Sequence, residues 1–213
     1  MDNLGSRLKD IRLKAGLTLR ELARQVDVSP SFVSQIENGK SQPSVATLYA
    51  FSQRLKVSVD ELFEGTSPVH DPIEGDPAAV GNMLTDPASA WIPTEYANRI
   101  SVVHPRHRSR LDMAAGVVWE RLAATPEHAV SFMKIIYAPG ASSADTEELS
   151  QHAGYEYGFV TEGQLEVTVG DEKFLLNEGE SLGFDSSIPH AFRNPGPTEM
   201  QGIWFVHGRP ASP

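Results

Sequence analysis

Hydrophobic positions in the first 64 residues recur at helical spacing, in short runs separated by capping residues. Apolar residues from Leu4 to Ala15 lie three or four positions apart, which predicts a first helix that ends at Gly16. Four further apolar runs follow, and each begins close to a hydroxyl side chain that can cap a helix N-terminus. These capping residues are Thr18, Ser29, Ser44 and Ser58. We therefore expect residues 1–64, called the head below, to form a compact bundle of five short helices.

Beyond residue 98 the pattern changes to short segments with strand character. Nine such segments lie within residues 99–209, the first at 100–104, at a spacing of roughly 8–12 residues with Gly, Pro or Asp between them. This pattern predicts an all-β sandwich or barrel, called the barrel below. Residues 65–98 are rich in proline and keep no durable period, which indicates a linker or an irregular arm. The expected fold class is α+β with two domains.

Composition narrows the class of protein. The 213 residues are 40% hydrophobic and include no cysteine, which excludes disulfides and thiolate metal sites. No apolar run approaches the roughly 20 residues that a membrane span needs, and the polar N-terminus does not read as a signal peptide. We therefore expect a cytoplasmic protein with no membrane partner, which fits the absence of cysteine in a reducing compartment.

The charge is distributed unevenly between the two parts. Residues 1–64 hold nine Lys and Arg against eight Asp and Glu, a net charge of +1. The remaining 149 residues hold nine against twenty, a net charge of −11, so that the whole chain carries −10. This distribution permits phosphate contacts by the head alone and disfavours loose binding of nucleic acid by the barrel.

The second and third predicted helices are joined by the brief turn "DVS", which is the geometry of a helix-turn-helix. In this motif the second of the two helices lies in the DNA major groove. Val33 and Ile36 face inward, which leaves small polar side chains and one aromatic ring outward. Gln35 suits a bidentate pair with adenine, and Phe32 suits contact with a thymine methyl group. The residues expected at base edges and nearby phosphates are Ser31, Phe32, Ser34, Gln35 and Asn38.

Phosphate contacts would position that helix on the duplex. Backbone N–H groups at helix starts are one source of such contacts. Hydroxyl and basic side chains near the helix ends are the other source, and the candidates are Thr18, Arg20, Ser29 and Lys40.

The segment from Leu8 to Phe63 resembles the Xre-type, lambda-repressor-like DNA-binding domain over nearly its full length. The matching features are Gly16-Leu17-Thr18, Leu22-Ala23, Ser29, Val33-Ser34, Glu37-x-Gly39, Pro43-Ser44, Leu48 and the closing Leu62-Phe63. The resemblance implies an internal ion pair between Arg12 and Glu37, and proteins of this type usually bind operator DNA as dimers. One departure is Leu19, where the family often has a glutamine that contacts DNA.

The strand region resembles a second family. His152-x3-Glu156, followed by His190-x3-Asn194, resembles the two motifs of the small β-barrels called cupins. The resemblance implies a double-stranded β-helix in which a His-x-His pair, a glutamate and a later histidine point inward and bind one metal ion. This chain departs from the pattern at Ser150, which stands where the first histidine of the pair belongs.

His152, Glu156 and His190 are therefore the candidate ligands of one divalent metal ion. Imidazole nitrogens and a carboxylate suit Fe, Mn, Ni, Zn or Cu, and two His with one Glu is also the set of non-haem iron oxygenases. The alternative is a barrel interior in which hydrogen bonds hold these side chains without metal. Small barrels commonly enclose one ligand. The large side chains expected to line an effector pocket, or alternatively to form plain core, are Trp119, Met133, Tyr155, Phe159 and Trp204.

Two functions remain open at this point. The first is a sequence-specific transcriptional regulator without enzymatic activity, in which the head binds double-stranded operator DNA, the barrel binds a small-molecule effector, and the chain forms a homodimer. The second is a mononuclear non-haem iron enzyme. "HAGYE" with "PHAF" resembles the epoxidase that acts on hydroxypropylphosphonate, which also joins a helix-turn-helix-like domain to a cupin. The polar outward face of the third helix favours the regulator.

Overall fold

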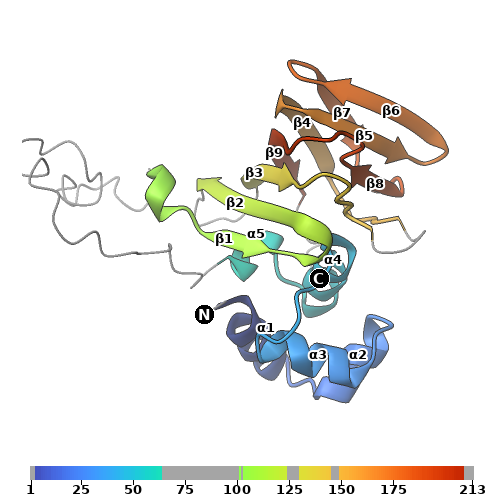
Figure 1. Cartoon of the computed structure of the whole chain (residues 1–213). Coiled ribbons are helices and arrows are strands. Elements are labelled where there is room, and N and C mark those ends of the chain that lie inside the picture. The colour runs from blue at the N-terminus through green and yellow to red at the C-terminus, as the bar shows by residue number, and fades with distance from the viewer. Residues whose placement is uncertain (1–2, 64–100, 102, 124–129, 145–148, 209–213) are drawn as a thin grey trace, which may run out of the picture.

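The computed structural model describes residues 3–63, 101, 103–123, 130–144 and 149–208, and Figure 1 shows a helical head beside a β-barrel. The predicted linker, residues 65–98, lies outside these ranges. The five predicted helices are confirmed as α1 (Asn3–Lys14), α2 (Leu19–Gln25), α3 (Pro30–Glu37), α4 (Val45–Leu55) and α5 (Val59–Leu62). None of the helices within the described ranges is long and apolar enough to span a membrane.

Local capping chemistry explains where these helices start. At each predicted capping residue the side-chain oxygen accepts a hydrogen bond from the backbone N–H three residues later. Thr18 with Glu21 and Ser58 with Glu61 form complete capping boxes, in which the glutamate also accepts a hydrogen bond from the backbone N–H of the capping residue. Short helices of this kind gain most of their stability from packing, and these caps set where each one begins.

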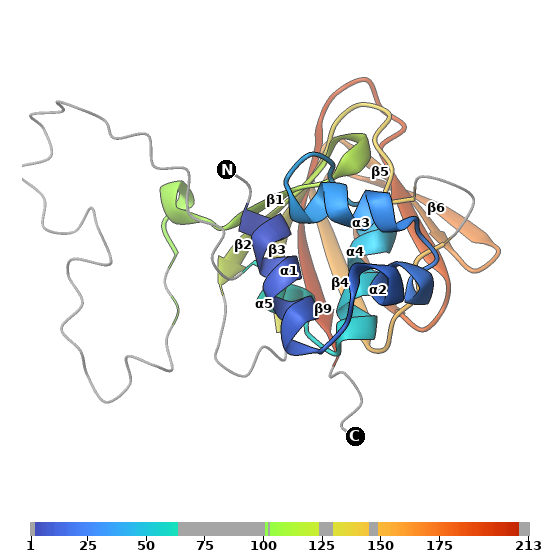
Figure 2. The same cartoon turned by 90° about the horizontal axis from the view of Figure 1, so that it is seen from below.

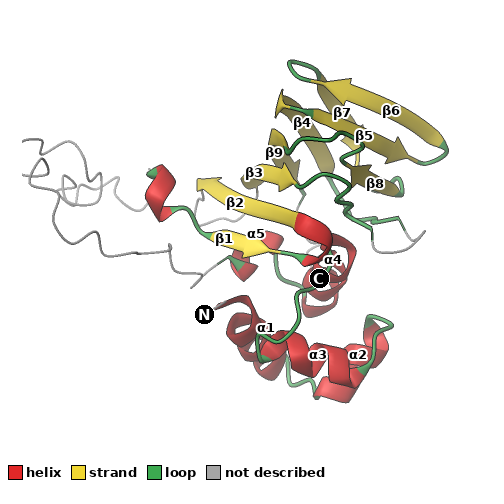
Figure 3. Ribbon diagram, viewed as in Figure 1, coloured by secondary structure: helices red, strands yellow, loops and turns green. Residues whose placement is uncertain are grey.

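The strands form two sheets that together make the barrel. A six-stranded sheet has the order β1-β2-β3-β9-β4-β7, and a three-stranded sheet has the order β6-β5-β8. All recorded pairings within the two sheets are antiparallel. Figure 3 shows the strands above and α1, α2 and α3 below, with α4 and α5 between them. The strands are β1 (Arg110–Asp112), β2 (Val117–Ala123), β3 (Val130–Tyr137), β4 (Tyr155–Glu162), β5 (Gln164–Val169), β6 (Glu172–Asn177), β7 (Ser181–Asp185), β8 (His190–Arg193) and β9 (Met200–His207).

One predicted strand was wrong. The described residues within 100–104 form no strand, and the first strand is β1, several residues later. A short 3₁₀ helix at Pro105–His107 separates the two positions, and the His104 side chain caps it by accepting a hydrogen bond from the N–H of Arg106. Proline at the start of this turn fixes the backbone in a helical conformation, which interrupts an extended segment.

Alternation along the strands sends one set of side chains into the barrel. On β3, Ser131, Met133, Ile135 and Tyr137 are buried, while the residues between them are partly exposed. The buried hydrophobic residues of the head and the barrel form one core cluster. The two domains therefore share apolar surface instead of being joined by their linker alone.

Helices α4 and α5 and the loop before α4 contact the barrel. In that loop the carbonyl oxygen of Pro43 accepts a hydrogen bond from the N–H of Ala114 at 3.0 Å. The side-chain amide of Gln53 donates a hydrogen bond to the carbonyl oxygen of Gln151 at 2.6 Å. Nη1 of Arg121 on β2 lies 3.5 Å from Oδ2 of the buried Asp60. Helices α1, α2 and α3 lie on the side of the head away from the barrel in Figure 1, and they lie in front of it in the view from below (Figure 2).

Candidate functional sites in the head and the barrel

The outer face of α3 is open to solvent. Val33, Ile36 and Glu37 are buried on the inner side of the helix, and Gln35 and Asn38 are exposed on the outer side. Because the barrel packs on α4 and α5, it leaves this outer face uncovered (Figure 2). The arrangement matches a helix-turn-helix in which α3 is free to enter a groove.

Several predicted DNA-contacting side chains make local hydrogen bonds. Ser29 and Ser31 share a hydroxyl contact of 2.9 Å, and the Asn38 side chain donates to the backbone carbonyl of Ser34 at 2.7 Å. Oε1 of Gln35 accepts a hydrogen bond from the Ser41 hydroxyl at 3.1 Å, so the amide nitrogen remains available. These bonds hold the side chains in place while their other polar atoms face water.

The basic and aromatic candidates differ in exposure. Thr18, Arg20 and Lys40 are exposed, as phosphate contacts require. Phe32 is only partly exposed, because it packs against the core of the head. Contact between its exposed part and a thymine methyl group stays a prediction.

A buried ion pair supports α3 from behind. Nη2 of Arg12 on α1 donates to Oε2 of Glu37 at 2.9 Å, and Nε of the same guanidinium donates to Oε1. The hydrogen bond to Glu37 raises the pKa of Arg12 despite the opposing effect of burial. Arg12 also donates to the carbonyl oxygen of Leu17, just before α2. The ion pair that the family resemblance implied is therefore present and links α1 to α3. The bond to Leu17 links the same arginine to the start of α2.

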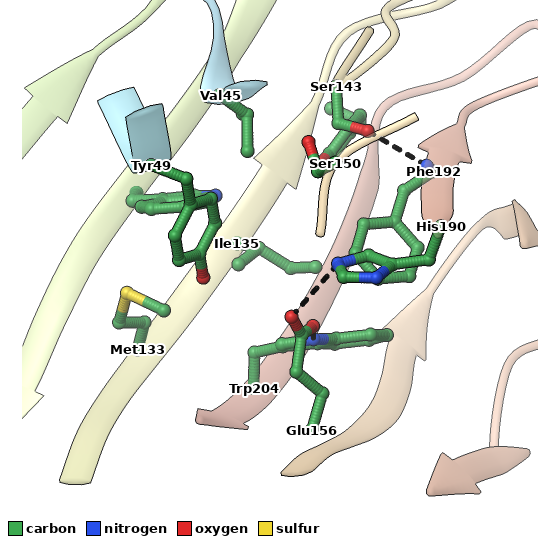
Figure 4. Close-up of a pocket in the computed structure, with 12 residues that line it drawn as sticks. Val45, Tyr49, Met133, Ile135, Ser143, Ser150, Glu156, His190, Phe192 and Trp204 are labelled. Atoms are coloured by element: carbon green, nitrogen blue, oxygen red, sulfur yellow. Dashed lines mark hydrogen bonds and ion pairs between the residues drawn. The ribbon is translucent and has the colours of Figure 1, made fainter. Parts of the chain in front are cut away.

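His152, Glu156 and His190 converge inside the barrel. His152 lies in the loop before β4, Glu156 on β4 and His190 at the start of β8. Nε2 of His152 lies 2.7 Å from Oε1 of Glu156, and Nε2 of His190 lies 3.2 Å from the same oxygen. One ligand atom from each of the three residues lies within 4.8 Å of the others, and all three side chains are buried. Figure 4 shows Glu156 and His190 facing each other across the pocket.

The tautomer of His190 suits a cation. Its Nδ1 lies 2.8 Å from the carbonyl oxygen of Ile188, and a carbonyl only accepts, so Nδ1 carries the proton. In a neutral ring, Nε2 then presents its lone pair toward the Glu156 carboxylate, and a positive charge is needed between the two acceptors. A metal ligand histidine usually has this same bond from its other nitrogen to a backbone carbonyl. The donor set therefore fits a divalent metal ion.

Protonation of His190 is the other source of that positive charge. Burial opposes it, but the hydrogen bond to Glu156 and the carboxylate charge together raise the pKa of His190. For Glu156, burial acts to raise the pKa, and hydrogen bonds from His152 and His190 outweigh it, so the pKa falls to about 2. Glu156 is thus a carboxylate at neutral pH, with or without a metal.

Trp204 and Gly158 hold Glu156 in position. Nε1 of Trp204 on β9 donates a hydrogen bond to Oε2 of Glu156 at 2.7 Å, which leaves Oε1 directed at the two histidines. The indole lies across Gly158 on β4, where an added Cβ would come within 2.1 Å of the ring. A glycine at this position is therefore a condition for the hydrogen bond.

Ser150 lies at the edge of the same site. It forms an isolated antiparallel bridge with His190, with backbone hydrogen bonds of 2.8 Å in both directions. Its hydroxyl is buried and has no hydrogen-bond partner within the part of the chain that the structure describes. Ser150, which stands where cupins have the first ligand histidine, therefore lies beside His190 with a hydroxyl that is free to donate a hydrogen bond.

Three of the five predicted pocket residues line a cavity, and two do not. Trp119, Met133 and Trp204 face it together with Glu156 and His190. Tyr155 and Phe159 are half-exposed on the outside of the barrel, so their assignment to the pocket was wrong. The reason is strand alternation: β4 sends Glu156 inward, and residues of the opposite parity must point outward.

The sequence interpretation missed two pocket residues that come from the head. Val45 and Tyr49 of α4 line the cavity, and the Tyr49 ring stacks on His152 at 4.1 Å between centroids and 12° between planes. Burial above all, and then the carboxylate of Glu156, raise the pKa of Tyr49, which keeps its phenol protonated. The sequence held a signal for this contact. Helix α4 carries more apolar residues than Leu48 and Phe51, which already fill the core of the head.

The fold and the two sites define a protein in which a helix-turn-helix head is docked on a cupin barrel. The helix-turn-helix family matches residues 8–62, and the cupin-domain family matches residues 133–206. The chain belongs to the Xre-type helix-turn-helix transcriptional regulators with a C-terminal cupin domain.

Individual relatives agree with this assignment. The chain is 26% identical over 192 residues to the HTH-type transcriptional regulator PuuR of Escherichia coli, covering 89% of this chain and 86% of PuuR. The crystal structure of an HTH_3 family transcriptional regulator from Vibrio cholerae has the same fold, with a TM-score of 0.61, 20% identity and coverage of 97% and 95%. The Fe(II) form of the epoxidase HppE matches with a TM-score of 0.46, 22% identity and coverage of 96% and 98%, which is too low for a functional argument.

Proposed function

We propose that this transcriptional regulator is a one-component sensor, in which α3 reads operator DNA and the barrel binds a small-molecule effector. The observation that carries the DNA-binding part is the outer face of α3, which is polar, exposed and turned away from the barrel. The only carboxylate on this helix, Glu37, is buried against Arg12 and does not face the phosphates. The protein would act in the cytoplasm, where its DNA target lies.

DNA binding is tested with the full chain and the DNA that lies upstream of its own gene. Fluorescence anisotropy should show binding to this fragment, with an affinity that falls steeply as salt rises, because Lys and Arg release counterions from phosphates. A scrambled fragment of equal length is the control. Equal affinity for both fragments at every salt concentration would contradict sequence-specific recognition by α3.

For the barrel, we infer that His152, Glu156 and His190 bind one divalent metal ion. Support comes from the converging ligand atoms and from the proton on Nδ1 of His190, which directs the lone pair of Nε2 into the site. When bound, the metal would supply positive charge and coordination positions for an effector atom. Metal analysis of the purified chain, followed by competition with a chromogenic chelator, should give one ion per chain, and His152→Ala should lose it.

A homodimer is the assembly that operator recognition requires, since helix-turn-helix proteins bind paired half-sites. We propose that the outer face of β4 and β9 forms the contact. Tyr155, Tyr157, Phe159 and Phe205 are each at least 40% exposed there, and a cluster of exposed aromatic rings is typical of an interaction surface. Light scattering should give a dimer for the wild type and a monomer for Tyr157→Glu. Phe174→Glu, on the other sheet, is the matched control and should remain dimeric.

The ligand set also favours a second candidate, a non-haem iron enzyme. Two histidines and one glutamate leave coordination positions open for substrate and dioxygen. Against it, the lining residues in the described ranges include no Lys or Arg that could pair with a phosphonate. Oxygen uptake by the Fe(II)-loaded chain with hydroxypropylphosphonate decides between the two. We expect no uptake above that of Fe(II) alone, and turnover would establish the enzyme.

A further inference from the structure

The cavity in the barrel is closed by the DNA-binding head. Helix α4 places Tyr49 and Val45 over the opening, and Figure 4 shows both residues entering the space from the helix side. Tyr49 is 8% exposed and touches two groups of the barrel. Its ring stacks on His152 and meets Trp119 edge-on at 5.9 Å between centroids. A side chain of the head is therefore in direct contact with a candidate metal ligand.

Two buried polar atoms that border the cavity have no hydrogen-bond partner among the described residues. They are the hydroxyl of Ser150 and the indole N–H of Trp119, on side chains that are 6% and 4% exposed. An unpaired buried donor is costly, and native proteins rarely leave one without a reason. An indole N–H can only donate. A ligand that satisfies both groups must therefore present oxygen acceptors.

The charges around the cavity select the kind of acceptor. Glu156 and His190 are the only lining residues in the described ranges, apart from two tyrosines, that can ionise. A divalent metal on the triad would leave a net charge of +1 beside one carboxylate. An anion with a single charge, such as a carboxylate, fits this site better than a cation or a phosphonate.

Space is the remaining constraint. The free space between the lining atoms is about that of one water molecule. A carboxylate with even a short carbon chain is larger than this. Most barrel residues that line the cavity lie on paired strands, apart from Ser143 and Ser150, whereas Tyr49 and Val45 come from the head. Movement of α4 is therefore a way of making room that leaves the sheets intact.

We propose that Tyr49 is part of the sensing site, and that a small carboxylate displaces its ring from His152 and thereby releases α4 from the barrel. The inference rests on the proposed function, because it assigns the effector class and the means by which the head detects it. Trp119 and Ser150 bind the carboxylate oxygens. The contact between Gln53 and Gln151 at the same surface opens with α4, so that occupancy of the barrel changes how the head is held.

The first test measures ligand class without DNA. The full chain is loaded with Co(II), whose visible spectrum reports its surroundings, and acetate is added as the probe with neutral acetamide as the matched control. Acetate should change the spectrum and acetamide should not. Ser150→Ala should weaken acetate binding by about fivefold to tenfold at unchanged Co(II) affinity, as loss of one hydrogen bond predicts. Absence of Co(II) uptake, or an equal response to both probes, would overturn the carboxylate assignment.

The second test concerns Tyr49. Tyr49→Ala removes the group that acetate must displace, so acetate affinity should rise by about tenfold. Tyr49→Phe keeps the stacked ring and should behave like the wild type, as should the surface variant Phe174→Ala. Val45→Ala opens the cavity from the same helix and should raise affinity by a smaller factor, which covers the case that Tyr49→Ala does not fold. Lower or unchanged affinity in the opened variants would overturn the proposal.

The third test asks whether the head itself moves. The chain has no cysteine, so Gln53→Cys with Gln151→Cys gives a unique pair that a short bismaleimide can join. The joined protein should bind acetate about tenfold more weakly than the unjoined double variant. Equal affinity would show that Tyr49 turns aside without release of α4 and would overturn the mechanism. Because none of these readouts uses DNA, failure of operator binding would leave them interpretable.

Discussion

The outer face of α3 and the interior of the barrel both present polar side chains, but in opposite surroundings. On α3, Gln35 and Asn38 face water, so an atom without a protein partner is hydrated at little cost. In the barrel, Glu156 and His190 are buried, and each of their polar atoms needs a partner or a bound ion. A substitution in the barrel interior should therefore change metal affinity strongly. A substitution on the outer face of α3 should mainly change the preference for one DNA sequence over another.

The largest effect is expected for Glu156→Gln, which keeps the shape of the side chain and removes its charge. Both histidine Nε2 atoms face this carboxylate, so metal affinity should fall by more than about 100-fold, beyond the usual effect of losing an outer partner. Competition with a chromogenic chelator measures the change. Glu162→Gln, at the exposed end of β4, is the matched control, and a loss of less than tenfold in Glu156→Gln would contradict the site.

Trp204→Phe tests the hydrogen bond that positions Glu156 in the barrel. The phenyl ring keeps most of the packing and loses the N–H that holds Oε2 of Glu156, so metal affinity should fall by about 10- to 100-fold. Trp119→Phe is the control, because its indole N–H donates to no residue within the described part of the chain and metal affinity should stay unchanged. Equal effects of the two changes would mean that packing, and not the hydrogen bond, positions Glu156.

On the surface of α3, Gln35→Ala should relax sequence preference. We expect the difference in binding free energy between operator and scrambled DNA to shrink by about 1–3 kcal/mol, because a bidentate contact with a base is lost. Competition between labelled operator and unlabelled scrambled DNA measures this difference. Gln164→Ala in the barrel should have no effect, and an unchanged preference in Gln35→Ala would remove this residue from the interface.

The smallest effect is expected for Lys40→Ala. Loss of one phosphate contact should weaken binding to operator and scrambled DNA alike, and it should reduce the slope of log affinity against log salt by about 1. Titrations at several salt concentrations give this slope. Lys173→Ala on β6 removes the same charge from the barrel, and a similar change in slope for both variants would show that Lys40 acts only through net charge.

The head could be predicted almost completely from the sequence because its signals are local. A capping serine or threonine, a proline in the first turn and an apolar repeat each act within a few residues. They located α2, α3, α4 and α5 closely. The ion pair between Arg12 and Glu37 was harder, since the two residues are 25 positions apart and only the family resemblance implied it.

The barrel site was predictable in its ligands but not in its surroundings. The resemblance to the cupin motifs identified His152, Glu156 and His190 as one group of candidate ligands. Pocket residues depend on strand parity, and the same parity that sends Glu156 inward excludes Tyr155 and Phe159. The extra apolar residues of α4 signalled a further contact of the head, but no spacing rule links α4 to a loop about one hundred positions later, so the sequence did not identify the site as the partner.

The shared apolar cluster determines how each half behaves as an isolated fragment. Truncation after α5 would remove the barrel that covers Val45 and Tyr49, and both side chains would face water. A fragment of this kind would self-associate or shift its fourth helix, and its melting would differ from that of the same residues in the intact polypeptide. Heating the whole chain should instead produce a single cooperative transition, since neither half completes its interior alone.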